Sequence, residues 1–131
     1  AVASGLIDIV CSMHTPQDEE SKRLPFEEAA SGAVGLETLL PAALRLWHAG
    51  MITLPQLWRA MSFNPAQRLG LTSGRLEAGA SADLVLFDPH APFVMDRTNL
   101  LSKSRNTPFD GVRMQGKVLA TYVAGACVYN V

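Results

Sequence analysis

The sequence has little charge, and the charge that it has is nearly balanced. Charged residues make up 18% of the chain, the formal net charge is −1, and there is neither a basic run nor an acidic tail. That balance gives no electrostatic reason to bind nucleic acid or an anionic membrane. Gly, Pro or a charged residue interrupts every apolar stretch, so none is long enough to cross a bilayer. We therefore expect no nucleic-acid partner and no membrane partner.

Cysteine is almost absent, and the few metal-binding side chains are not clustered. Cys11 and Cys127 lie far apart in apolar runs, which predicts two buried, reduced thiols of a cytoplasmic protein rather than a disulfide. His14 follows Cys11 by three residues, but a zinc site needs further ligands and no second Cys/His pair exists. We expect no metal to be bound by this chain alone.

The sequence also lacks an initiating Met, a basic n-region and a signal-type apolar core where it begins, at Ala1. We interpret that beginning as a cut through a longer chain or as a processed end. The 131 residues, 48% of them hydrophobic, are enough for one folded domain with its own core.

The first third of the chain predicts a strand followed by a long loop. Leu6–Cys11 is a short apolar run, typical of a strand that is buried on both faces of a parallel sheet. The polar, turn-rich stretch 12–35 follows it. Loops after parallel strands are where α/β barrels carry their chemistry, so we expect functional residues in this stretch.

Two helices and a short helical turn are expected next. An apolar stripe over Leu36–Ala49 predicts a helix, in which Pro41 is tolerable only near the first turn. Thr53-Leu54-Pro55-Gln56 matches a capping box and predicts a second helix that runs to about Ser62. Asn64 should then cap a short helical turn.

The remaining sequence predicts a small β unit. Its expected strands are Asp83–Asp88, Phe93–Met95, Val112–Met114, Lys117–Val123 and Cys127–Tyr129. Ala124-Gly125 predicts a tight hairpin between the last two. A closed barrel needs eight β/α units in about 250 residues. One unit cannot close a barrel, so either the rest of the chain is missing or the strand pairs with something else.

Several segments, taken in order along the chain, resemble the end of a dihydroorotase. They include Ser12-Met13-His14-Thr15-Pro16-Gln17, Gly32-Ala33-Val34-Gly35-Leu36-Glu37-Thr38, Gly79-Ala80-Ser81-Ala82-Asp83-Leu84 and Ser102-Lys103-Ser104-Arg105-Asn106-Thr107-Pro108-Phe109. The match is collinear and covers nearly all of the chain. The third segment alone marks only the wider amidohydrolase group, whereas the second and fourth point to dihydroorotases, particularly the bacterial branch.

The resemblance implies an α/β fold in two parts. Residues 1–70 would form the last β/α unit or units of a (β/α)8 amidohydrolase barrel, and residues 71–131 a small β-rich domain that is part of a composite β-sandwich. The implied reaction is the zinc-dependent, reversible hydrolysis of dihydroorotate to N-carbamoyl-aspartate in pyrimidine biosynthesis. The family's zinc ligands would lie before Ala1. The implied partners are the rest of the barrel, a small-molecule substrate and further copies of the chain in a homo-oligomer.

The chain departs from the family pattern where the catalytic acid is expected. The family's Ser-Asp-His-Ala-Pro-His aligns with residues 12–17, which puts Met13 where the resemblance expects the proton-transferring Asp. A thioether has no titratable proton and is a weak zinc ligand, so we assign no catalytic residue to this chain. In some relatives the acid follows the His instead, but in this chain that position holds Thr15, which cannot serve as the acid either. We interpret the acidic run 18–20 as solvated loop; the alternative is that one of its carboxylates substitutes for the missing acid.

Four residues are candidates for binding the substrate. Gln17 replaces a family His that helps to hold the substrate carboxylate, and its neutral amide should bind an anion more weakly. His14 matches the family His beside the missing acid. Ser31 and Gly32 match the loop that offers backbone groups to the pyrimidine ring, although Gly32 would serve backbone geometry equally well.

Other notable side chains have plainer interpretations. His48 at a helix end and His90 in a surface turn are read as structural, and Trp47 and Trp58 as core residues on apolar helix faces. We interpret Lys22-Arg23 as solvent-exposed charges that keep the loop soluble; the alternative is that the pair screens the charge of an anionic substrate.

Three functions compete at this point. The first is a piece of a dihydroorotase or of a dihydroorotase-like subunit. The second is a non-catalytic family member that acts as a scaffold for aspartate carbamoyltransferase, which Met13 and Gln17 favour for the whole protein. The third, another cyclic amide hydrolase such as an allantoinase or hydantoinase, is disfavoured by the segment 102–109.

Overall fold

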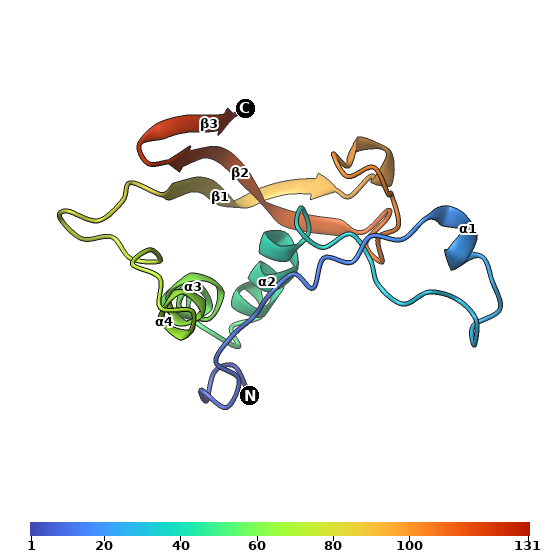
Figure 1. Ribbon diagram of the computed structural model, residues 1–131, viewed down its shortest axis with the longest axis horizontal. Coiled ribbons are helices and arrows are strands. Elements are labelled where there is room, and N and C mark those ends of the chain that lie inside the picture. The colour runs from blue at the N-terminus through green and yellow to red at the C-terminus, as the bar shows by residue number, and fades with distance from the viewer.

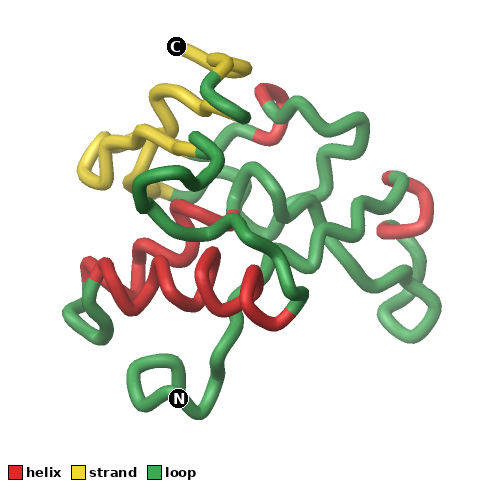
Figure 2. Tube along the Cα trace, turned by 60° about the vertical axis from the view of Figure 1, so that its left-hand side comes forward, coloured by secondary structure: helices red, strands yellow, loops and turns green.

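The computed structural model describes residues 1–131, as a three-stranded sheet with its helices on one side (Figure 1). Seen from the side, strands and helices form two layers, and long loops extend away from them (Figure 2). The elements in chain order are α1 (Glu19–Lys22), α2 (Leu39–His48), α3 (Leu54–Trp58), a π-helical turn (Arg59–Phe63), α4 (Asn64–Arg68), β1 (Leu84–Val94), a 3-10 turn (Arg97–Asn99), β2 (Arg113–Val123) and β3 (Ala126–Asn130).

Helix α2 forms close to where its apolar stripe predicts it. It begins at Leu39, three residues later than expected, so that Pro41 lies in the first turn, where a missing N–H breaks no helical hydrogen bond. The face that carries Ala43 and Leu44 is buried. The apolar spacing therefore located both the helix and its inner side.

The capping box at the start of α3 is confirmed, but the predicted end of that helix is wrong. Thr53 accepts a hydrogen bond from the Gln56 backbone N–H at 3.3 Å, and the Gln56 side chain accepts one from the Thr53 N–H at 2.8 Å. The helix does not stop near Ser62, because the π-helical turn joins α3 directly to α4. Asn64 is therefore helical rather than a cap, and its side-chain amide donates to the Asp8 carbonyl at 2.8 Å.

The sheet is antiparallel, with the strand order β1-β2-β3. Each of the first two strands merges two of the predicted strands, because register shifts between Leu86 and Phe87 and between Asp88 and Pro92 absorb the prolines of β1 without ending it. The predicted hairpin at Ala124-Gly125 is confirmed. The Asp83 carboxylate accepts the Ala124 N–H at 2.8 Å and so fastens this turn.

The predicted strand Leu6–Cys11 is not formed by this chain on its own. Leu6 and Ile7 lie in a bend, the rest of the segment has no regular secondary structure, and the side chain of Leu6 is 82% exposed. A parallel strand is stabilised by hydrogen bonds to strands on its two sides, and no strand of this chain pairs with it. The predicted burial of both cysteines is wrong for related reasons: Cys11 and Cys127 are free thiols at exposed positions of unpaired or edge segments.

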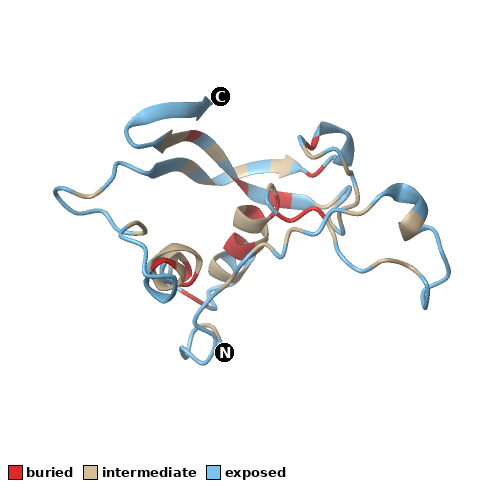
Figure 3. Cartoon of the chain, in the orientation of Figure 1, coloured by how far each residue is buried: buried red, intermediate tan, exposed pale blue.

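The core is small and divided. Of the 131 residues, 15 are buried, many of them around α2 and the adjoining part of β2 (Figure 3). One cluster consists of Ala43, Leu44, Ile52 and Leu57, and the other of Val34, Met95, Leu100 and Met114. The predicted core tryptophans, Trp47 and Trp58, are only half-buried at the edge of this core. No helix of the chain has the length and apolar character needed to cross a membrane.

The contact between β2 and α2 requires a glycine, and this generates a first prediction. Gly116 has φ +106°, and a methyl group there would overlap the fully buried side chain of Leu44. In the full-length polypeptide that carries this segment, Gly116→Ala should lower the free energy of unfolding by about 3 kcal/mol, about 1 from the positive φ and about 2 from overpacking. Chemical denaturation measures this change.

Gly79→Ala is the matched control, because Gly79 also has positive φ, +88°, but no atom lies within 4 Å of its added methyl group. It should lose only about 1 kcal/mol. Equal losses in the two variants would show that the tight approach of β2 to α2 is not present.

Candidate functional site

The candidate site is built from two loop segments that run side by side, residues 12–17 and 31–36. The Thr15 N–H donates to the Ala33 carbonyl at 3.0 Å. The two backbones approach so closely that a methyl group on Gly32 would overlap Thr15, and one on Gly35 would overlap Ser12. Gly32 also has φ +117°. The alternative left open for Gly32, that backbone geometry alone demands glycine, therefore has a direct structural basis.

His14 is held by the opposite segment through one ring nitrogen. The backbone N–H groups of Gly35 and Leu36 both donate to His14 Nδ1, at 3.0 and 3.3 Å. A nitrogen that accepts from backbone donors carries no proton, so the ring is neutral and its proton lies on Nε2. His14 can thus offer a hydrogen bond from Nε2, while Nδ1 is blocked for any ligand.

Gln17 and Gly32 are joined by a residue that the sequence did not single out. The Asn106 side chain accepts the Gln17 N–H at 3.1 Å and donates to the Gly32 carbonyl at 3.0 Å. The Ser104 hydroxyl lies within hydrogen-bond reach of the Gln17 carbonyl and, at 2.6 Å, of Asn106 Oδ1. Both residues belong to the family-like segment 102–109. That resemblance was the only signal in the sequence that could have pointed to them.

The loop between the two segments contains α1, which the sequence did not predict either. Asp18 caps this helix by accepting the Ser21 N–H at 2.7 Å, and this bond holds the pKa of its carboxyl below the ordinary value. The cap is therefore present above the ordinary pKa and is lost as the pH falls through the lowered one. Glu19 forms an exposed ion pair with Arg23 at 2.6 Å. Both carboxylates thus have local structural partners.

Lys22 and Val34 hold residues 31–36 in position. Lys22 Nζ donates to the carbonyls of Ala30 and Gly32, at 2.6 and 3.3 Å. The Lys22 side chain therefore bonds the loop backbone and is not merely a solvent-exposed charge. Val34 is 1% exposed and packs in the core cluster with residues of the β unit. The N–H of Val34 donates to the Asn106 carbonyl at 2.9 Å. The position of residues 31–36 therefore depends on the C-terminal part of the chain.

The residues of this chain do not form a metal site. No group of three or more His, Cys, Asp or Glu side chains lies close enough together to hold a metal ion. Met13 is 75% exposed and has φ +44°, a conformation that side chains rarely adopt. His14 cannot ligate through Nδ1, for the reason given above. The side chains of this chain alone therefore offer no ligand set for a zinc ion.

The remaining candidates take no part in these hydrogen bonds. The Ser31 side chain is exposed. His48 ends α2 and bonds the Pro89 carbonyl through Nε2 at 3.0 Å, while its ring lies 5.7 Å from that of His90. Both histidines pack beside Trp47, so they join α2 to β1 and do not belong to the two segments. Of the four predicted substrate-binding residues, Gln17 and Gly32 are joined through Asn106, and His14 bonds the segment that contains Gly32.

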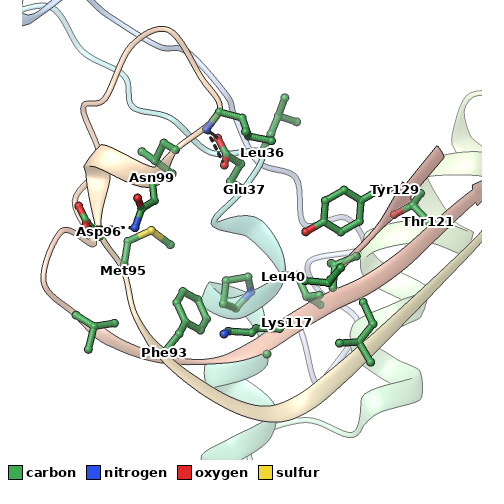
Figure 4. Close-up of a pocket in the computed structure, with 18 residues that line it drawn as sticks. Leu36, Glu37, Leu40, Phe93, Met95, Asp96, Asn99, Lys117, Thr121 and Tyr129 are labelled. Atoms are coloured by element: carbon green, nitrogen blue, oxygen red, sulfur yellow. Dashed lines mark hydrogen bonds between the residues drawn. The ribbon is translucent and has the colours of Figure 1, made fainter.

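A separate hollow of about 650 Å³ lies between the start of α2 and the strands (Figure 4). Its labelled lining includes Leu40, Phe93 and Tyr129, and most of its wall is apolar. The Glu37 carboxylate at its rim accepts the N–H groups of Leu101 and Ser102, at 3.0 and 3.2 Å. That carboxylate therefore holds the backbone that follows the 3-10 turn, and the lining also contains Asp96 and Lys117.

Comparison with known proteins places this geometry in a family. A family model described as "Amidohydrolase family" matches residues 29–129. A dihydroorotase of Pelobacter propionicus is 44% identical over 129 residues, which cover 98% of this chain and 30% of the relative. A dihydroorotase of Geobacter metallireducens is 43% identical over 130 residues, which cover 99% and 31%.

Solved structures give the same picture. The dihydropyrimidinase from Brevibacillus agri matches with a TM-score of 0.92 and 26% identity over 99% of this chain and 30% of its own. The L-hydantoinase from Arthrobacter aurescens matches with a TM-score of 0.90 and 32% identity, over 98% and 30%. The chain thus spans about 30% of the length of these proteins and fits a fragment of an α/β amidohydrolase fold. The chain belongs to the amidohydrolase family, and the part it represents is a segment of a cyclic amidohydrolase.

Proposed function

We propose that this chain is the C-terminal segment of a dihydroorotase-like cyclic amidohydrolase, the class that interconverts dihydroorotate and N-carbamoyl-aspartate in pyrimidine biosynthesis. The observation that carries the proposal is the pairing of segments 12–17 and 31–36, which gathers His14, Gln17 and Gly32. The dihydroorotases among the relatives are more similar in sequence than the hydantoinases are, at 44% against 32% identity.

Residues 1–70 are proposed to complete a (β/α)8 barrel and residues 71–131 to form its small β domain. The apolar side chains that this segment leaves exposed support that assignment, because folded monomers rarely leave so many uncovered. They include Leu6 at 82%, Phe26 at 97%, Leu76 at 82% and Leu101 at 86% exposure. Leu6–Cys11 is then the last barrel strand, which needs neighbouring strands from the rest of the barrel. The assembled protein is proposed to be a homo-oligomer.

The proposed role of the two segments is to bind the substrate. His14 Nε2–H is a neutral donor, and the Gln17 amide is a second neutral group that can meet a carboxylate without a charge-assisted bond. Ser31 and Gly32 are proposed to present backbone groups to the ring. An anionic substrate should therefore bind here less tightly than in relatives that have a His at position 17.

Hydrolysis is proposed to be absent from the whole protein. In an active family member a bound metal supplies Lewis acidity and an activated water, but the residues of this segment do not fit that role. Proton transfer needs a titratable group, and the Met13 thioether has none. Two of the three alternative carboxylates of residues 18–20 are already engaged, because Asp18 caps α1 and Glu19 pairs with Arg23. We therefore propose a dihydroorotase-like protein that binds the substrate without hydrolysing it.

The second candidate function is a scaffold for aspartate carbamoyltransferase. Met13 and the neutral Gln17 favour it, because a subunit that only supports a partner enzyme retains its fold without its acid. The fold, the paired segments and the apolar surface are the same in both candidates, and hydrolysis is proposed to be absent from both, so binding of the partner enzyme separates them.

Of the predictions that this proposal generates, the first concerns turnover by the full-length protein. It should bind little zinc and hydrolyse dihydroorotate, or form it from N-carbamoyl-aspartate, at no rate above background, because Met13 cannot transfer the proton. Absorbance of dihydroorotate and elemental analysis measure both properties. Robust turnover by the unaltered protein would refute the inactive assignment.

Met13→Asp restores the missing carboxylate and is the matched variant. Where the barrel's other ligands are intact, it should raise turnover by at least about a hundredfold, the contribution expected of one general acid–base group. Met13→Leu is the control, since it changes the side chain without adding an acid, and it should leave turnover at background.

The second prediction concerns the partner. If the scaffold function is right, the full-length protein should co-purify with aspartate carbamoyltransferase of the same cell, and the complex should survive at moderate salt. Analytical size exclusion of the two purified proteins measures this directly. Independent elution of the two across a range of salt concentrations would count against the scaffold function.

A further inference from the structure

We infer that Asn106 is the positioning residue of the candidate ligand site and acts through the backbones of Gln17 and Gly32. The inference deepens the proposed function and rests on it for the identity of the ligand. Asn106 belongs to the β-unit side of the chain, 89 residues after Gln17 and 74 after Gly32. It nevertheless lies outside both loop segments and bonds each of them.

The geometry assigns each atom of the Asn106 amide a separate task. Oδ1 accepts the Gln17 N–H at 3.1 Å, Nδ2 donates to the Gly32 carbonyl at 3.0 Å, and the backbone carbonyl accepts the Val34 N–H at 2.9 Å. The orientation of the amide is fixed, because one partner only donates and the other only accepts. An ionised Asp, which has the same size and shape, accepts only and could not donate to Gly32.

Ser104 completes the arrangement. Its hydroxyl lies 2.6 Å from Asn106 Oδ1 and reaches the Gln17 carbonyl as well. The backbone N–H and the backbone carbonyl of Gln17 are therefore both held by side chains from this one short segment. Such a double contact fixes the direction of the Gln17 backbone at the point where residues 12–17 leave the site.

These contacts matter because the segments have no regular structure of their own. Residues 12–17 belong to no helix or strand, and Asn106 adds no apolar surface to the core. The relative position of Gln17 and Gly32 thus rests on individual hydrogen bonds. Removing them should open the loop locally while the core clusters stay intact.

The experiment uses the full-length protein with N-carbamoyl-L-aspartate as the probe, titrated by calorimetry. Asn106→Ala should weaken binding about tenfold, the effect of one to two hydrogen bonds. Asn99→Ala is the matched control, because the Asn99 amide bonds only Asp96 three residues earlier, and it should leave the affinity unchanged.

A second readout needs no ligand. Lys22 and Arg23 lie in the loop between the segments and are natural sites for trypsin. In Asn106→Ala, cleavage at these two positions should be about tenfold faster with an unchanged thermal midpoint, as expected for local opening. Asn106→Asp keeps the acceptor for Gln17 but loses the donor to Gly32, so it too should accelerate cleavage.

If Asn106→Ala does not fold, the variant Ser104→Ala tests whether this segment positions the two loops. It should weaken binding and accelerate cleavage about threefold, whereas Ser102→Ala should do neither, because the Ser102 hydroxyl has no hydrogen-bond partner in the chain. Unchanged affinity and cleavage in the Asn106 and Ser104 variants would overturn the inference. So would acceleration that merely follows a lower thermal midpoint. If the unaltered protein does not bind the probe, the proposed function fails, and the cleavage experiment alone decides the role of Asn106.

Discussion

The structure depends on the contact between two loop backbones, residues 12–17 and 31–36. Glycines at positions 32 and 35 allow the two chains to touch, because any side chain there would overlap the opposite backbone. Val34 anchors one of the segments in the core, and Asn106 ties both to the β unit. Residues 12–17 and 31–36 form no helix or strand, and these contacts give them one defined conformation.

That shape determines what the site can do. It leaves the His14 ring neutral with its free proton on Nε2, and it joins the backbones of Gln17 and Gly32 through Asn106. We propose that these groups bind a polar substrate; no cluster of metal-binding side chains lies among them. Membership of the amidohydrolase family, together with Met13 where the family resemblance expects an acid, therefore supports our proposal of a dihydroorotase-like segment that lacks this acid.

Features with local causes were predictable from the sequence. The capping box of Thr53 and Gln56, the apolar stripe of α2 and the turn at Ala124-Gly125 each follow from neighbouring residues, and all three are present. The strand Leu6–Cys11 and the cap at Asn64 failed, because each depends on distant partners: one lacks them, and the other bonds Asp8. The candidate residues were found through the family resemblance. Their mutual arrangement could not be found from the sequence, since Asn106 is 89 residues from Gln17 and no local spacing encodes that contact.

The tautomer of His14 tests the central claim most directly, because only the close contact of the two segments brings the donors of Gly35 and Leu36 to Nδ1. Long-range ¹H–¹⁵N spectra of the full-length protein with ¹⁵N-labelled histidine report the protonation of each ring nitrogen, and His14→Gln identifies the signal by its loss. The account predicts a neutral ring protonated at Nε2. A ring protonated at Nδ1 at neutral pH would contradict it, because the two segments could not then lie together as described.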